Sequence, residues 1–237
     1  MSIAGLWPLP AILLPVLAYA RGPSAGKARL VAFAVGWTLA VLSFSGPADD
    51  IAERSFFLHM VAHTVLMGVA APLLVLARPL PRGIGPFRAL TEPVTATFLQ
   101  AGALAVWHLP VLFDAALADR RIHALQHLTL LGTSLLFWQG IGEARRSEER
   151  QGLAVVCLFL ASVLGTLLGF LLTLASGFWY TPIAAPICGL SPLADQQLGG
   201  LVMWVPAGLV YVGAGLGLLA RWIKGSAASA AWTPEQG

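Results

Sequence analysis

The chain has 237 residues, of which 57% are hydrophobic and only 11% are charged. Soluble domains carry about 25% charged residues, so this composition excludes an ordinary soluble domain and predicts an all-α, polytopic membrane helix bundle. The formal net charge of +3 does not indicate nucleic acid as a partner, because excess Lys and Arg in a membrane protein normally marks its cytoplasmic loops.

Seven segments are apolar enough to be spans, since a spanning helix needs about 20 predominantly apolar residues. In chain order they are residues 5–20, 29–46, 56–77, 93–113, 122–141, 152–175 and 199–220. We therefore interpret residues 1–225 as one transmembrane domain of seven helices. The Ala- and Ser-rich residues 226–237 are interpreted as a disordered cytoplasmic tail.

The first of these segments is the least regular. It is short and proline-rich, and Ala18-Tyr19-Ala20 at its end resembles a signal-peptide cleavage site. However, residues 1–7 contain no Lys or Arg, whereas a signal peptide begins with a positively charged region. From the sequence, both retention and removal of this segment stay open.

The distribution of Lys and Arg predicts the orientation of the bundle. With the N-terminus outside, the segments on the inner side hold eleven Lys and Arg residues, and those on the outer side hold three, namely Arg54, Arg120 and Arg121. Positive residues accumulate on the cytoplasmic side of membrane proteins. We therefore expect the N-terminus outside, the C-terminus inside, and membrane lipid around the bundle.

Four of the five histidines form two pairs, His59 with His63 and His123 with His127. The i, i+4 spacing places both imidazoles of a pair on one helix face. Both pairs fall in the first turns of spans that run inward, and His108 falls at the outer end of a span that runs outward. We therefore expect all five histidines at one depth, in the outer half of the membrane.

Five histidines at one depth predict a metal site, because polar groups within a bilayer are costly and usually functional. Neutral imidazole binds copper, zinc, iron and nickel. Met67, four residues beyond His63, and Met203 in the last span are candidate auxiliary ligands, and thioethers favour Cu(I). Asp114 and Asp195, predicted at the outer face, are further candidates as ligands or as groups that orient an imidazole.

Other interpretations of the histidines stay open. A bis-histidine haem between two helices would make the protein a redox carrier, although two imidazoles within about 6 Å on one helix suit a compact ion better. A metal or proton transporter would need polar residues through the inner half, where Gln139 and Thr173 do not extend the histidine line. A hydrogen-bonded network between helices is the simplest structural alternative.

Several remaining patterns are typical of architecture. Gly165 and Gly169 form a G-x-x-x-G motif that permits close helix approach. The aromatic run at residues 178–180 fits an interfacial belt at the level of the lipid headgroups. Cys157 and Cys188 form no C-x-x-C pair and are predicted at opposite faces, so we expect no thiolate metal site and no disulfide.

The chain also resembles a known family in a set of ordered motifs. They are His59-Met60-x-x-His63 with Leu66-Met67 and Ala71-Pro72-Leu73-Leu74, Trp107-His108-x-Pro110 with Phe113-Asp114, His123-x-x-x-His127, and Asp195-Gln196-Gln197 with Gly199-Gly200 and Met203-Trp204. Together these motifs resemble the multi-span CtaG family of cytochrome c oxidase assembly factors, across nearly all predicted spans. Ala62 stands where the family pattern would have a polar residue such as Gln.

The resemblance implies a function that the residues alone do not. It implies a multi-pass protein of the bacterial inner membrane that delivers copper to haem-copper oxidase, without catalytic turnover of its own. The implied partner is the oxidase subunit that carries the buried copper centre, and a homo-oligomer is compatible with the sequence. The implied copper ligands are the five histidines, His59, His63, His108, His123 and His127.

Overall fold

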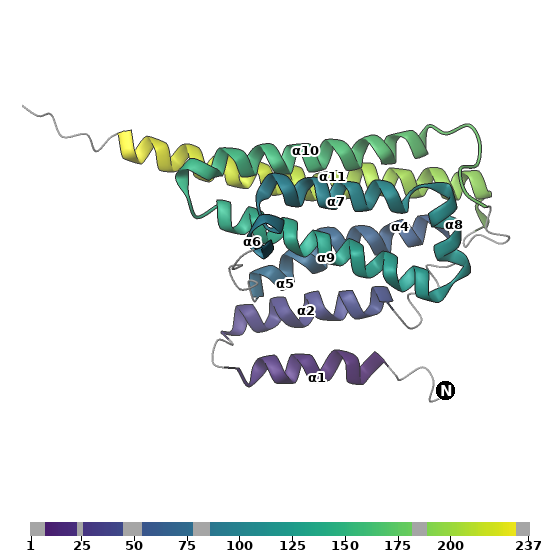
Figure 1. Cartoon of the computed structure of the whole chain (residues 1–237), viewed down its shortest axis with the longest axis horizontal. Helices are drawn as coiled ribbons and strands as arrows, with labels where there is room; N and C mark the ends of the chain where they lie inside the picture. Colours follow the sequence, from purple (N-terminus) through teal and green to yellow (C-terminus); the bar gives the residue numbers. More distant parts are fainter. Residues whose placement is uncertain (1–7, 23–25, 45–53, 78–85, 182–188, 231–237) are drawn as a thin grey trace, which may run out of the picture.

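A computed structural model of the chain describes residues 8–22, 26–44, 54–77, 86–181 and 189–230, which form helices and no strand. The helices are α1 (Pro8–Ala20), α2 (Lys27–Phe44), α4 (Phe56–Val65), the π-helical turn η2 (Leu66–Ala70), α5 (Ala71–Ala77), α6 (Pro86–Leu90), α7 (Pro93–Trp107), α8 (Pro110–Ala118), α9 (Arg120–Ala144), α10 (Glu148–Thr173) and α11 (Pro192–Ala230). The long helices lie side by side and alternate in direction, with α1 at one edge and α10 and α11 at the other (Figure 1).

The bundle has the composition of a polytopic membrane protein. Four of its described helical segments are long and apolar enough to cross a membrane: residues 27–44, 56–77, 149–173 and 192–224. The consecutive helices α7 and α8 provide a fifth if they count as one bent span. The predicted all-α membrane bundle is thus confirmed at this level, and the count of seven spans and the orientation stay predictions.

Helix α9 occupies the place of the predicted fifth span but has a more polar composition than the spans named above. The reason is visible in its burial pattern. The polar side chains of Gln126, Ser134 and Gln139 are buried, whereas Leu125 and Leu128 are more than half exposed. This helix therefore buries polar side chains together with apolar ones such as Phe137 and exposes large apolar side chains, whereas a helix on a water-soluble protein exposes its polar face.

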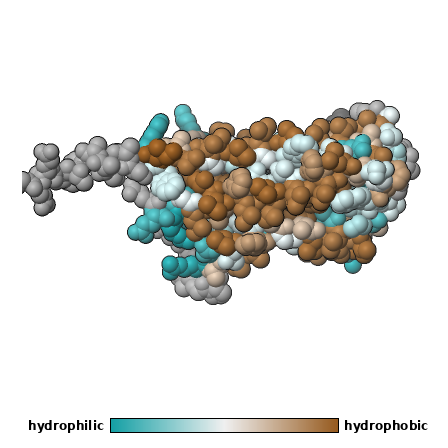
Figure 2. All heavy atoms as spheres, turned by 90° about the horizontal axis from the view of Figure 1, so that it is seen from above, coloured by the Kyte–Doolittle hydropathy of each residue, from teal (hydrophilic) through white to brown (hydrophobic). Residues whose placement is uncertain are grey.

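The outer surface follows the same inversion. Large apolar side chains project outward along the helices, among them Val111, Phe159 and Leu209, each with about two thirds or more of its surface exposed. Figure 2 shows hydrophobic residues as a broad band over the middle of this face of the molecule, with hydrophilic residues toward its ends. Such an apolar surface is typical of a membrane protein.

The first predicted span is a short helix that packs into the bundle. Helix α1 has 13 residues, and Tyr19 donates a hydrogen bond from its hydroxyl to the carbonyl of Ala77 at 2.8 Å. The same ring stacks on Phe33 of α2, with ring centroids 4.4 Å apart. Tyr19, the middle residue of the sequence that resembles a cleavage site, thus holds α1 against α2 and the end of α5.

The predicted fourth span, residues 93–113, is broken in the structure. Helix α7 ends at Trp107, and α8 begins at Pro110 after a bend of 73°. Leu109 has an extended backbone, with φ −65° and ψ 130°. A proline disfavours helical backbone in the residue before it and fits the first turn of a new helix, so Pro110 explains both the break and the restart.

The end of the chain also differs from the sequence-based expectation. Helix α11 continues to Ala230, so residues 226–230 are helical where a disordered tail is predicted. Residues 231–237, the rest of that tail, lie outside the described residues.

The G-x-x-x-G motif brings helices together at one of its two glycines. A Cβ on Gly169 would lie 2.7 Å from both the carbonyl oxygen of Gly200 and the amide nitrogen of Trp204, so α10 and α11 cross with their backbones in contact. A Cβ on Gly165 would meet only the end of Leu104, at 3.9 Å. Close approach therefore depends on Gly169 and Gly200, from different helices, rather than on the motif within α10.

The two glycines give a matched prediction. Gly169→Ala should lower the free energy of unfolding by about 2 kcal/mol, because the α10 and α11 backbones must separate to admit the methyl group. Gly165→Ala makes an ordinary contact and should leave stability within about 0.5 kcal/mol of the wild type. Thermal unfolding of both variants in the same detergent tests this, and equal losses would contradict the assigned crossing point.

Candidate metal centre

Three helices bring the five histidines together at one end of the bundle. His59 and His63 lie on α4, His123 and His127 lie on α9, and His108 lies at the break after α7. Centroids of neighbouring imidazole rings are separated by 4.4 Å for His59–His63, 4.3 Å for His123–His127, 5.3 Å for His59–His123, 4.9 Å for His63–His127 and 6.2 Å for His63–His108. The fold thus gathers the five rings, and their depth in the outer half of a membrane stays a prediction.

All five imidazoles are buried, each with 4% or less of its surface exposed. Both ring nitrogens of His59 and of His63 lack hydrogen-bond partners among the described residues. A buried polar atom without a partner costs about 1–3 kcal/mol, so proteins seldom tolerate four of them side by side. The two imidazoles on α4 therefore have lone pairs available for a ligand.

Two other histidines are oriented by backbone carbonyls. Nδ1 of His108 donates to the carbonyl of Leu104 at 2.7 Å, and Nδ1 of His127 donates to the carbonyl of His123 at 3.1 Å. Each bond keeps the proton on Nδ1 and leaves the Nε2 lone pair of the neutral ring free to bind. Nε2 of His108 lies 3.3 Å from Sδ of Met60, so two electron-pair donors face one another.

The distances between the imidazole rings are compatible with a shared metal ion, but the side chains do not yet point their nitrogens at one position. Imidazoles that bind one metal through nitrogens at about 2 Å have ring centroids about 5–6 Å apart, which the distances between α4 and α9 match. In the described part of the chain, however, no three His, Cys, Asp or Glu side chains form a ready metal group. Rotation of side chains would be needed to converge on one ion.

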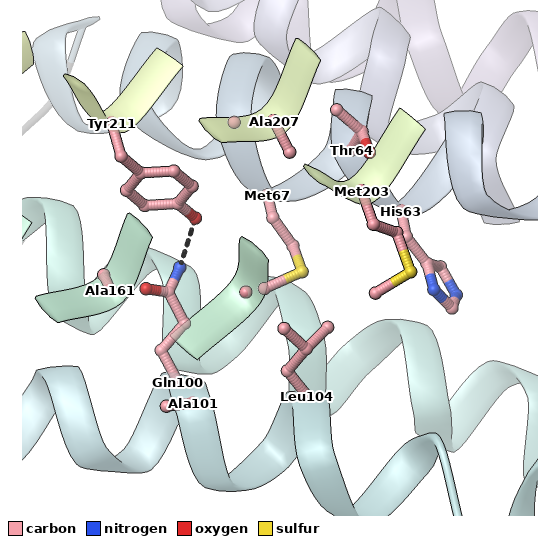
Figure 3. Close-up of a pocket in the computed structure, with 12 residues that line it drawn as sticks. His63, Thr64, Met67, Gln100, Ala101, Leu104, Ala161, Met203, Ala207 and Tyr211 are labelled. Carbon is pink, nitrogen blue, oxygen red and sulfur yellow. Dashed lines mark hydrogen bonds between the residues drawn. The ribbon is translucent and has the colours of Figure 1, made fainter. Parts of the chain in front are cut away.

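Met67 and Met203 line a small cavity of about 50 Å³ next to the histidines. Figure 3 shows both thioethers pointing into this space, with the ring of His63 beside Met203. At the other side of the cavity, Gln100 donates to the hydroxyl of Tyr211 at 3.0 Å. His63 therefore belongs both to the histidine cluster and to the thioether-lined cavity.

A π-helical turn places Met67 in this wall. The amide of Ala71 bonds to the carbonyl of Leu66 five residues back, and Pro72, the next residue, has no amide proton to offer. The carbonyl of Met67 thus loses its helical partner. The indole of Trp138 replaces it, donating at 2.9 Å, so α9 holds the turn that carries the thioether.

Asp195 holds the start of the helix that carries the first histidine pair. This buried carboxylate, from α11, accepts from the hydroxyl of Ser55 at 2.6 Å and from the amides of Phe56 and Phe57 at 2.7 Å and 3.3 Å. The first amides of a helix have no partner within the helix, and a carboxylate also complements the helix dipole. Asp195 therefore positions the first turn of α4, directly before His59.

An aromatic side chain covers the cluster at the end of the bundle. The hydroxyl of Tyr180 donates to the carbonyl of His108 at 3.0 Å, and its ring packs on Phe113 and Phe56 with centroids 4.3 Å and 5.0 Å away. Burial raises the pKa of Tyr180, which keeps the hydroxyl protonated as a donor. The prediction that residues 178–180 form an interfacial belt is wrong for Tyr180, because its side chain is buried. Phe178 and Trp179 are exposed.

The loop that carries Tyr180 is fastened by polar side chains. Asp114 accepts from the amide of Thr181 at 3.1 Å and from its hydroxyl at 2.7 Å. Gln196 accepts from the amide of Trp179 at 2.9 Å, and Gln197 donates to the carbonyl of Ala175 at 3.0 Å. Asp114 and Asp195, predicted as auxiliary ligands or orienting groups, are thus engaged in holding backbone around the cluster.

The comparison with known families now decides the relationship of the chain. The family model described as cytochrome c oxidase caa3 assembly factor (Caa3_CtaG) matches residues 13–225. The chain belongs to this family. The resemblance found in the ordered motifs is therefore confirmed, and no curated protein or solved structure matches the chain.

In this assembly-factor chain, the structure adds two side chains that sequence reasoning did not place in the site. Gln126 is fully buried with its amide close to the ring of His59, and neither amide atom meets full hydrogen-bond geometry with a described residue. Its signal was the spacing of three residues from His123, which puts a second kind of polar group on the histidine face. Met60, which follows His59 in the sequence, is the second of these side chains, and its sulfur lies 3.3 Å from Nε2 of His108.

The cap formed by Asp195 gives a second prediction. Asp195→Ala leaves a hydroxyl and two amides without their acceptor inside the protein, so the free energy of unfolding should fall by about 3 kcal/mol. Asp119→Ala removes the exposed cap of α9, which accepts from the amide of Arg121, and should cost about 1 kcal/mol. Equal thermal destabilisation of the two variants would contradict the special role of Asp195.

Proposed function

We propose that this chain binds copper in the histidine cluster and delivers it to the oxidase that its family assembles. The observation that carries the proposal is the pair of imidazoles on α4, whose four ring nitrogens are buried without partners beside three further imidazoles. A metal cation would accept the one lone pair that each of these neutral rings offers. The proposed ligand set is His59, His63, His108, His123 and His127.

Copper is favoured over harder ions by the chemistry of the surrounding donors. The thioethers of Met60, Met67 and Met203 lie at or next to the cluster. Thioether and imidazole together suit Cu(I), whereas the nearby carboxylates, which suit harder ions, already accept backbone hydrogen bonds, Asp114 from Thr181 and Asp195 from Phe56. Met67 and Met203 are proposed as auxiliary ligands through which copper leaves His63 toward the side of the bundle.

The proposed setting follows from the family and from the distribution of charge. The chain would lie in the bacterial inner membrane with the histidine end on the outer side, where the ion enters beneath Tyr180. The partner would be the oxidase subunit with the buried copper centre, docked laterally. Ligand exchange between neutral donors would then transfer the ion without the strong retention of a thiolate cluster, and no catalytic step is assigned to the chain.

Metal analysis of the purified protein tests the site. After loading with Cu(I) and removal of excess, the wild type should retain copper, and His59→Ala/His63→Ala should retain less than a tenth of that amount. His123→Ala/His127→Ala should lose copper similarly. Gln139→Ala, which truncates another buried polar side chain of α9 far from the cluster, is the matched control and should bind as the wild type.

The outcomes separate the proposal from its rivals. Unchanged copper in both double variants would refute the site. A Soret band with stoichiometric haem in the wild type would favour the haem-binding alternative instead.

Delivery is tested separately in cells that lack the gene. Wild-type protein should restore both the copper content and the activity of the oxidase, and the histidine double variants should restore neither. A variant with Met67→Leu and Met203→Leu keeps the apolar volume but removes both thioethers. It should retain copper and lower the rate of transfer to the oxidase, and an unchanged rate would refute the exit route.

A further inference from the structure

A second, larger cavity lies at the end of the bundle opposite the histidines. It has a volume of about 780 Å³ and is lined by residues from α2, α5, α9, α10 and α11. Its lining residues on α9 and the following turn begin at Trp138, eleven residues beyond His127, which corresponds to about 16 Å along a helix. The crevice is therefore separate from the candidate copper site.

The crevice arises because two helices diverge. Helix α11 packs closely along α4 but makes little contact with η2 and α5, which continue α4 beyond the π-helical turn. The space between α5 and α11 is floored by Val75 and Leu76 from one side and Leu218 from the other. Leu76 has 57% of its surface exposed, so this floor is accessible from the lipid side of the bundle.

The rim of the crevice is strongly basic. Five cationic side chains, from α2, α11 and the turn between α9 and α10, line it, namely Arg29, Arg145, Arg146, Arg221 and Lys224. None of them forms an ion pair with another described residue. The one carboxylate in the lining, Glu143, already accepts a hydrogen bond from Gln139 at 2.7 Å. A concave site with a net excess of positive charge and an apolar floor is the result.

We propose that this crevice binds an anionic phospholipid. The guanidinium groups of Arg145, Arg146 and Arg221 would bind the phosphate, since arginine pairs with phosphate through two parallel hydrogen bonds. The acyl chains would lie along Leu76 and Leu218, between α5 and α11. Basic pockets between membrane helices bind the headgroups of anionic lipids in this manner.

The amphipathic lining selects this occupant over others. A free anion would use the basic rim but would gain nothing from the apolar floor, which opens between helices. A zwitterionic phospholipid would fill the floor but carries a positive group that the five cations repel. Phosphate and acyl chain in one molecule satisfy both parts, and the membrane supplies that molecule at high local concentration.

Lipid retention by the full-length protein tests the proposal. Native mass spectrometry of protein equilibrated with a mixture of phosphatidylglycerol and phosphatidylcholine should show preferential retention of phosphatidylglycerol. Arg145→Gln/Arg146→Gln/Arg221→Gln should reduce that preference at least tenfold. The matched control, Arg21→Gln/Arg88→Gln/Arg150→Gln, removes three positive charges at the same end of the bundle but outside the crevice, and should leave the preference unchanged.

Two further measurements distinguish the lipid from simpler anions. Leu76→Trp fills the floor while keeping every charge, and should lower retention even if the triple arginine variant fails to fold. Inorganic phosphate and glycerophosphoglycerol, which lack chains, should not displace the lipid at millimolar concentration. Displacement by either anion, equal retention of both lipids by the wild type, or equal effects of the two triple variants would overturn the proposal.

Discussion

The arrangement of this protein depends on one constraint, which is that five imidazoles are enclosed where water cannot solvate them. The helices that contribute to the cluster bury polar side chains beside apolar ones and expose large apolar side chains, as α9 shows most clearly with Gln126 inside and Leu128 outside. Exposed apolar side chains cost little free energy in a lipid environment. The free-energy cost falls instead on the buried rings of His59 and His63, which lack hydrogen-bond partners among the described residues.

The cluster is held by segments that are far apart in the sequence. Asp195 of α11 caps α4, Tyr180 of the preceding loop covers His108, and Trp138 of α9 completes the π-helical turn below His63. Each of these contacts acts on backbone rather than on an imidazole. The surrounding protein therefore fixes the helices and leaves Nε2 of His108 and His127 and the ring nitrogens of His59 and His63 available, a division suited to a site that must bind an ion and release it.

Sequence reasoning reaches the helices and the gathering of the histidines at one end of the bundle because both follow from local rules. The i, i+4 spacing and the alternation of basic segments suffice to gather His59 and His127 at one end. Tertiary contacts are beyond such rules. The burial of Tyr180, the engagement of Asp195 as a cap and the facing of Met60 with His108 each depend on how separate helices dock, and hydropathy alone undervalues α9 because its polar residues point inward.

The π-helical turn between His63 and Pro72 rotates the two halves of this helix relative to each other. One residue more than an α-helical turn advances everything beyond it by about 100° around the axis. The half of this segment that carries the histidines can thus face α9, while the half from Ala71 to Ala77 faces away from α11 and opens the basic crevice. Loss of a single residue from Leu66–Ala70 would turn the two halves back into one α-helical register. The helix could then orient either its histidines or its α5 residues as they now lie, but not both.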